Sequence, residues 1–117
     1  MYMKPKVIDL FCGIGGFSKG FEMAGFDIVL GVDNWDIALE TFQKNHNNTT
    51  ILEADIREVK DDVFRKYKNI DVIIAGPPCQ GFSMCGKRDI KDKRNTLFEE
   101  LLRAVKIIDP KIVVIEN

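Results

Sequence analysis

Short apolar runs alternate along the chain with segments in which apolar residues recur at helical spacing. The runs are rich in β-branched residues and predict strands at residues 7–11, 26–32, 51–52, 71–75 and 111–115. The helical spacing predicts helices at residues 17–24, 36–45, 59–64 and 96–108. Apolar strands that alternate with helices form parallel sheets covered by helices on both faces. We therefore expect an α/β fold with a doubly wound, mainly parallel sheet.

The residues of unusual chemistry directly follow the predicted strands. Glycines within 13–16 follow the first strand, Asp33 the second, Asp55 the third, residues 77–79 the fourth and Glu116 the fifth. In doubly wound sheets, ligands bind outside the carboxyl ends of the strands. The predicted strand ends therefore indicate a single site.

Composition narrows the class of protein. The chain has 117 residues, of which 45% are hydrophobic and 30% charged, and this fits one globular domain. A formal net charge of −1 gives no electrostatic argument for binding nucleic acid or membranes. Three cysteines and one histidine offer neither a disulfide framework nor the usual ligands of a metal site. No apolar run reaches the roughly 18 residues of a membrane span, so we expect a cytoplasmic protein with no membrane partner.

The glycine turn and Asp33 have the arrangement of a nucleoside site. A glycine-rich turn that enters a helix lets the backbone approach a ligand, and an acid after the second strand can accept hydrogen bonds from ribose hydroxyls. Ser18 stands where the dinucleotide fingerprint needs its third glycine, and the chain has no phosphate-binding loop motif. An adenosine-containing cofactor without pyrophosphate therefore fits better than NAD or ATP. The alternative is a tight turn with a purely structural role.

Three further features can carry chemistry, and each has a structural alternative. Cys79 follows two prolines that fix its position, and its thiol is either a nucleophile or a small buried hydrophobe. Glu116 follows four apolar residues; partly shielded from water it can donate a proton, and otherwise it is a cap or a solvated chain end. Residues 87–94 hold five basic and two acidic side chains, which suits phosphate contact or a solvated loop. We interpret Cys12 and Cys85 as buried hydrophobes.

Four motifs resemble those of the DNA (cytosine-5) methyltransferases, in order and over nearly the whole chain. Asp9-Leu-Phe-Cys-Gly-Ile-Gly-Gly16 resembles the family's cofactor-binding motif, and Gly76-Pro-Pro-Cys-Gln-Gly-Phe-Ser83 resembles its catalytic motif. Arg94-Asn-Thr-Leu-Phe98 is similar to the segment behind the family's mobile loop, and Glu116-Asn117 to the start of its Glu-Asn-Val motif. The resemblance implies an incomplete Rossmann-like fold with S-adenosylmethionine as cofactor. It also implies methyl transfer to carbon 5 of cytosine in double-stranded DNA, in restriction-modification or host methylation.

The resemblance assigns expected roles to the residues of the cofactor site. It implies that S-adenosylmethionine lies against the glycine turn, that Asp33 binds its ribose and that Asp55 reads the adenine edge. The full set of expected cofactor residues is Phe11, Gly13, Ile14, Gly16, Asp33, Asn34, Trp35, Asp55, Ile56 and Leu97.

Cytosine chemistry is expected at the remaining motifs. By resemblance, the Cys79 thiolate attacks carbon 6 of a flipped-out cytosine, and Glu116 hydrogen-bonds the ring nitrogen at position 3. Carbon 5 is too weak a nucleophile without the bond at carbon 6, so both a thiol and an acid are needed. Pro78 and Gln80 belong to the same catalytic tetrapeptide. The expected contacts to nucleic acid are Ser83, Lys87, Arg88 and Arg94.

Family members continue beyond the last of these motifs, with further strands, an arginine-bearing motif, a target-recognition domain and a closing segment. We therefore expect residues 1–117 to form a single partial catalytic domain, as a fragment, a truncated product or one subunit of a split enzyme with a complementing chain. In the family's sheet the fifth strand is internal, so residues 111–115 should form an unprotected apolar edge. Two other functions stay open: methylation of cytosine in RNA, and a non-catalytic module that binds the cofactor or a partner chain.

Overall fold

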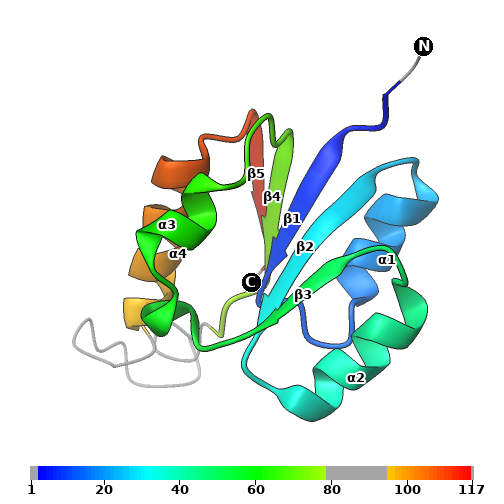
Figure 1. The fold of residues 1–117 in the computed structure, drawn as a ribbon, viewed down its shortest axis with the longest axis horizontal. Helices are drawn as coiled ribbons and strands as arrows, with labels where there is room; N and C mark the ends of the chain where they lie inside the picture. Colours follow the sequence, from blue (N-terminus) through cyan, green and yellow to red (C-terminus); the bar gives the residue numbers. More distant parts are fainter. Residues whose placement is uncertain (1–2, 79–94, 117) are drawn as a thin grey trace.

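The computed structural model describes residues 3–78 and 95–116, and these form one sheet with helices on either side (Figure 1). Its strands are β1 Lys6–Leu10, β2 Asp27–Asp33, β3 Thr50–Glu53, β4 Val72–Ala75 and β5 Ile112–Ile115. They lie in the order β3-β2-β1-β4-β5, and every neighbouring pair is parallel. The parallel, doubly wound sheet expected from the alternating pattern is confirmed.

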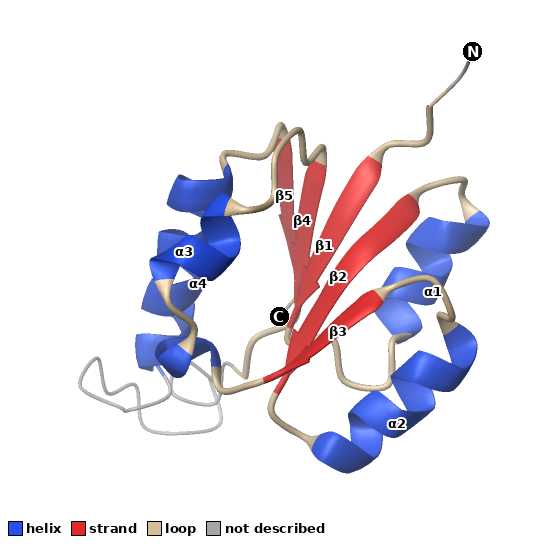
Figure 2. Cartoon of the chain, in the orientation of Figure 1, coloured by secondary structure: helices blue, strands red, loops and turns tan. Residues whose placement is uncertain are grey.

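Helices cover both faces of this sheet. They are α1 Gly16–Met23, α2 Asp36–Asn45, the short 3-10 helix η1 Ile56–Glu58, α3 Asp61–Arg65 and α4 Asn95–Ile108. Figure 2 shows α1 and α2 on one face, with α3 and α4 on the other. Among these described helices, none is long and apolar enough to cross a membrane.

The helix predicted at residues 59–64 is confirmed only in part, because α3 covers residues 61–64 of it while Val59 and Lys60 lie outside any helix. Asp55 caps η1: its Oδ1 accepts a hydrogen bond from the backbone N–H of Arg57 at 2.9 Å. Val59 and Lys60 then have extended backbone, which ends η1 and begins α3. The apolar spacing in this segment reflects packing onto a common core rather than one continuous helix.

The strands send side chains into two cores, one on each face of the sheet. Ile8 belongs with Phe64 of α3 to one buried cluster, and Val7 belongs with Phe42 of α2 to the other. All four side chains are fully buried. Complete burial of a phenylalanine stabilises a fold by about 1.5–3 kcal/mol, so the two cores fix both helical layers to the sheet.

Strand order reverses at β1, and this reversal places a crevice beside the end of that strand. The turn that follows β1 is tightly shaped: Phe11, Gly13 and Gly15 have φ of 60°, 53° and 94°. Gly15 also has no room for a side chain, because a Cβ there would lie 2.6 Å from Cδ2 of Phe42. The glycine turn is therefore held down on α2 while its other side faces the crevice.

β5 forms the edge of the described sheet. Ile112, Val113 and Ile115 are 58%, 36% and 40% exposed. Apolar edge strands with unpaired backbone groups favour pairing with another strand. The apolar edge expected at residues 111–115 is present.

Candidate functional site

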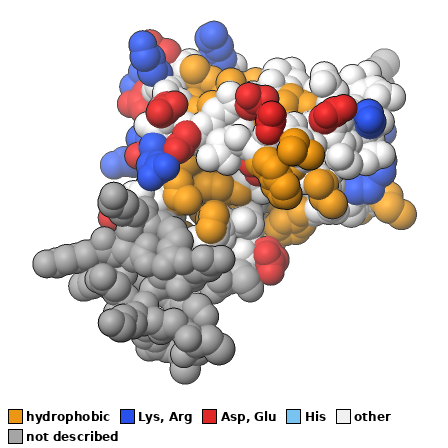
Figure 3. Space-filling model, turned by 90° about the horizontal axis from the view of Figure 1, so that it is seen from below, with side chains coloured by type: hydrophobic (Ala, Val, Ile, Leu, Met, Phe, Trp, Pro, Cys, Tyr) orange, Lys and Arg blue, Asp and Glu red, His pale blue; other side chains and the backbone are white. Residues whose placement is uncertain are grey.

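A hollow of about 210 Å³ lies at the carboxyl ends of the strands. Figure 3 views the molecule from this end and shows exposed hydrophobic and acidic side chains, with lysines and arginines toward the margin. The walls come from the ends of four strands, from η1 and from the first turn of α4. The lining residues are Phe11, Val32, Asp33, Asn34, Ala54, Asp55, Ile56, Arg57, Gly76, Pro78 and Leu97.

Asp33 links the end of β2 to the glycine turn. Its Oδ2 accepts a hydrogen bond from the backbone N–H of Gly13 at 2.8 Å, and its Oδ1 accepts one from that of Trp35 at 2.9 Å. A carboxylate has about four acceptor positions, so each oxygen keeps capacity for a further donor. The Asp33 carboxylate is thus fixed in orientation and still able to bind a hydroxyl group in the hollow.

Asp55 and Arg57 form the rim of the hollow beside η1. The guanidinium of Arg57 lies on the Asp55 carboxylate, with Nη2 at 2.5 Å and Nε at 3.1 Å from Oδ2. The hydrogen bond from Arg57 lowers the pKa of Asp55 from its ordinary value, against the smaller effect of burial. The carboxylate is therefore charged at neutral pH.

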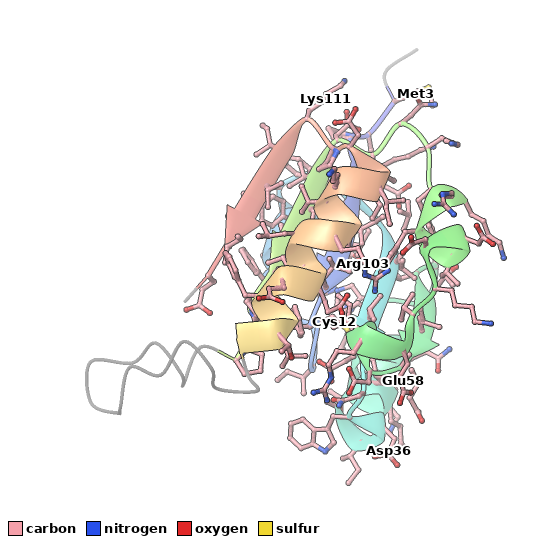
Figure 4. The ribbon with its side chains drawn as sticks, turned by 90° about the vertical axis from the view of Figure 1, so that its left-hand side faces the viewer. Met3, Cys12, Asp36, Glu58, Arg103 and Lys111 are labelled. Atoms are coloured by element: carbon pink, nitrogen blue, oxygen red, sulfur yellow. The ribbon has the colours of Figure 1, made fainter. Side chains whose placement is uncertain are left out.

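Arg103 holds the wall that carries Ile56. Its side chain extends from α4 toward α3 (Figure 4). Its Nη1 lies 2.6 Å from Oδ1 of Asp61, the first residue of α3. Its Nη2 donates to the backbone carbonyl of Ile56 at 3.0 Å, and its guanidinium lies 5.4 Å from the ring centre of Phe64. Leu97 lies on the same helix as Arg103. Arg103 therefore connects two walls of the hollow, the one that carries Leu97 and the one that carries Ile56.

A buried acid lies behind the turn, outside the hollow. Ser18 Oγ donates a hydrogen bond to Asp9 Oδ2 at 2.5 Å, and the two residues are 0% and 1% exposed. Burial raises the pKa of Asp9 to about 7; the Ser18 hydrogen bond opposes the rise, and Asp33 adds to it. Burial also raises the pKa of the Cys12 thiol far above its usual range. A thiol that stays protonated is a poor nucleophile, so the interpretation of Cys12 as a buried hydrophobe is confirmed.

Glu116 lies beside the hollow at the end of β5. Its backbone N–H donates to the carbonyl of Ala75 at 2.9 Å, and its Oε2 would lie 3.5 Å from a Cβ added to Gly76. Its carboxyl group therefore neighbours the residue that leads into Pro77 and Pro78. The expected shielding from water is wrong for the described part of the chain, where Glu116 is exposed because β5 is an edge strand.

The structure brings together part of the predicted site. Seven predicted residues line the hollow: Phe11, Asp33, Asn34, Asp55, Ile56, Leu97 and Pro78. Gly13 contacts it through Asp33. Ile14 and Gly16 line a different groove, between α1 and α2, and Trp35 is 57% exposed and does not line the hollow. Cys79, Gln80, Ser83, Lys87, Arg88 and Arg94 lie outside the described residues, as do Cys85 and Asn117.

Sequence reasoning missed two kinds of residue. Val32, Ala54, Arg57 and Gly76 line the hollow, although the sequence predicts this only for their neighbours. The sequence places His46 in a polar stretch after α2, yet it is 2% exposed and stacks on Phe42 with 4.3 Å between ring centres. Its four-residue spacing from Phe42 was the available signal. Within the described ranges, no group of three or more histidine, cysteine, aspartate or glutamate residues could hold a metal ion.

Strand order and the hollow at the carboxyl ends of the strands define a Rossmann-like α/β protein, with its candidate site where this fold binds ligands. Comparison of the sequence with models of known protein families identifies the family within this fold class. The chain belongs to the C-5 cytosine-specific DNA methylase family, whose model matches residues 5–117. The family expected from the four motifs is confirmed.

Individual relatives agree with this assignment. The chain is 45% identical to type II methyltransferase M.DdeI of Desulfomicrobium norvegicum over 95% of its own length and 27% of that protein. It is also 45% identical to type II methyltransferase M.HgiGI of Herpetosiphon aurantiacus, over 96% of this chain and 89% of the relative. A prophage-encoded E. coli protein described as a DNA modification methyltransferase has a similar structure, with 34% identity and a TM-score of 0.77 over 92% of this chain and 30% of that one. The chain thus spans less than a third of M.DdeI and of the E. coli protein.

Proposed function

We propose that this chain carries the cofactor site and the nucleophile of a DNA cytosine-5 methyltransferase that acts in restriction-modification or host DNA methylation. The observation that carries the proposal is the position of the catalytic motif. The family's catalytic motif begins at Gly76, directly after β4, and Pro78 lines the same hollow as Asp33 and Asp55. The similarity of the chain to type II methyltransferases supports DNA rather than RNA as the substrate. A cytoplasmic location follows from the same role.

S-adenosylmethionine fits the described hollow as the cofactor. The free acceptor positions of Asp33 suit the two ribose hydroxyls, since each oxygen has one backbone donor and room for another. Phe11, Ile56 and Leu97 supply apolar surface for a purine, and the Asp55 carboxylate, which Arg57 covers in this structure, is the proposed partner of its exocyclic amino group. When bound, the cofactor supplies an electrophilic methyl group. The remaining proposed cofactor-binding residues are Gly13, Ile14, Gly16, Asn34 and Trp35.

The proposed chemistry on cytosine uses this chain's own thiol and carboxyl groups. The Cys79 thiolate adds to carbon 6, and Glu116 donates a hydrogen bond to the ring nitrogen at position 3, which stabilises the negative charge that develops on the ring. Carbon 5 becomes electron-rich, accepts the methyl group and loses its proton. Expulsion of the Cys79 thiolate then restores the double bond between carbons 5 and 6. Pro78 supports this assignment, because its ring fixes its own φ and stiffens the backbone that leads into the nucleophile.

Recognition of the target sequence is proposed to reside elsewhere in the complete enzyme. The described residues form one sheet with its helices, and the chain covers less than a third of M.DdeI. A polypeptide that supplies the remaining region, whether continuous with this chain or separate, is the proposed partner. Lys87, Arg88, Arg94 and Ser83 are proposed to contact the DNA backbone near the target cytosine.

Calorimetric titration with S-adenosylhomocysteine tests the cofactor site. We expect the chain to bind this product and Asp33→Ala to bind at least tenfold more weakly, because the ribose loses its acceptor. Asp33→Asn keeps one carbonyl acceptor and should fall between the two. Asp62→Ala, which removes an exposed acid of α3, serves as the matched control and should bind like the native chain. A natively folded chain without measurable binding would contradict the proposal.

A further inference from the structure

The carboxylate of Asp55 is fully occupied by a single neighbour. Its Oδ1 accepts hydrogen bonds from the backbone N–H of Arg57 at 2.9 Å and from Arg57 Nε at 3.0 Å. Its Oδ2 accepts from Arg57 Nε at 3.1 Å and from Nη2 at 2.5 Å. The single hydrogen on Nε is shared between the two oxygens, so three hydrogens of Arg57 engage each oxygen twice and cover the four or so acceptor positions that a carboxylate offers. Asp55 therefore has no free acceptor for another donor in the hollow, in contrast to Asp33.

Three of these four contacts come from a side chain that is free to move away. The Arg57 side chain is 47% exposed, whereas that of Asp55 is 20% exposed. The backbone N–H of Arg57 belongs to η1 and stays in place when the guanidinium leaves. Negative charge at Glu58 and Glu100 also acts on the guanidinium, so it keeps a favourable environment away from Asp55. Exposed ion pairs of this kind contribute little free energy because water screens them, and displacement is therefore within reach of a ligand.

Resting on the function proposed above, we propose that Arg57 is an affinity- and specificity-determining residue that covers Asp55 and must be displaced by the exocyclic amino group of the cofactor's adenine. The amino group donates to the oxygen that Arg57 vacates, so ligand and arginine compete for one carboxylate. A purine with a carbonyl oxygen at the same position brings an acceptor toward Asp55. That oxygen is repelled by the carboxylate and attracted by the guanidinium. Arg57 thus lowers affinity for adenine and reduces discrimination against 6-oxopurines.

Removal of a pocket-lining arginine should then tighten binding, which distinguishes this role from a direct contact. Titration of the full chain with S-adenosylhomocysteine should give an affinity about two- to fivefold higher for Arg57→Ala than for the native chain, the range that corresponds to an exposed ion pair. Arg57→Gln keeps most of the side chain's length without its charge and should also bind more tightly. S-inosylhomocysteine, the 6-oxo analogue, should gain nothing from either change. High salt, which screens the ion pair, should bring the native affinity closer to that of Arg57→Ala.

Arg65→Ala is the matched control, because the Arg65 side chain has a similar exposure to that of Arg57 and pairs with Asp62 on α3 but does not line the hollow. Its affinity for S-adenosylhomocysteine should equal that of the native chain. Unchanged or weaker binding by Arg57→Ala and Arg57→Gln, with native binding intact, overturns the inference alone. Absence of binding by all of the folded chains, native included, overturns the proposed cofactor site and this inference together.

Discussion

Replacement of Asp9 by asparagine should change how the stability of the chain depends on pH. Asp9 has a pKa of about 3.8 when exposed and about 7 when buried in the fold. Below the lower value both states carry the proton, and burial has no electrostatic consequence. As the pH rises from about 4 to about 7, the unfolded chain releases this proton while the folded chain retains it, so stability falls. Above about 7 the loss reaches its limit.

The size of the effect follows from the shift in pKa. A pKa raised from 3.8 to about 7 corresponds to a total of about 4 kcal/mol, of which about 2–3 kcal/mol falls between pH 5 and pH 8. The asparagine side chain has no proton to release in this range, and its carbonyl can still accept the hydrogen bond from Ser18. The free energy of unfolding of Asp9→Asn, minus that of the native chain, should therefore rise by about 2–3 kcal/mol from pH 5 to pH 8.

Urea denaturation followed by far-ultraviolet circular dichroism, at several pH values, measures this difference. Titration of all other groups contributes to both proteins and cancels in the subtraction, as does any constant packing penalty of the new amide. Asp27→Asn, which removes an exposed acid from the neighbouring strand, is the control. Curves for Asp9→Asn and the native chain that run parallel from pH 5 to pH 8 would refute the argument, because Asp9 would then not be a buried acid that holds its proton.

Two further predictions concern the turn and the edge of the sheet. Gly15→Ala should lower the free energy of unfolding by about 2–4 kcal/mol in a urea titration, because φ is 94° and the new Cβ would lie 2.6 Å from Phe42. Gly20→Ala is the control: Gly20 has open space around it in α1, so this change should stabilise the chain by about 0.5–1 kcal/mol. Equal effects of the two substitutions would argue against the steric explanation. The native chain should self-associate in sedimentation velocity through its exposed β5 edge, and Ile112→Lys should weaken that association; a stable native monomer at high concentration would contradict this expectation.

The sheet could be predicted from the sequence because each strand carries its own signal. The run at 71–75 is apolar on both faces, as a strand between two helical layers must be, and β4 is fully buried. The helix predicted at 36–45 has the same bounds in the structure, since its apolar stripe ends at a polar stretch. In contrast, the sequence did not predict that Asp55 caps a separate short helix, η1, or that extended backbone at Val59 and Lys60 divides η1 from α3. Apolar spacing does not report on side-chain caps of this kind.

The site was predictable where strand ends determine position, and not where side-chain direction does. Asp33 and Asp55 follow parallel strands, and adjacent parallel strands bring their ends to the same edge. Arg57 reaches the hollow because a 3-10 turn brings it back over a residue two positions earlier, whereas Trp35 is exposed although it lies only two residues after β2. The exposure of Glu116 has a similar cause: its burial depends on what lies beyond β5, which an apolar run does not reveal.

The central position of β1 has a consequence for the order in which the chain assembles. Val7 pairs with Ile28 of β2, about 20 residues later, and with Val72 of β4, about 65 residues later. A ribosome that makes the chain from its first residue releases β2 long before β4, so β1 first exists with one paired side and one open side. Pairings between distant segments form slowly, because a long loop must be closed before any contact stabilises it. The central strand of the finished sheet is thus an exposed edge until β4 has been made, and the nascent chain is prone to aggregate in that interval.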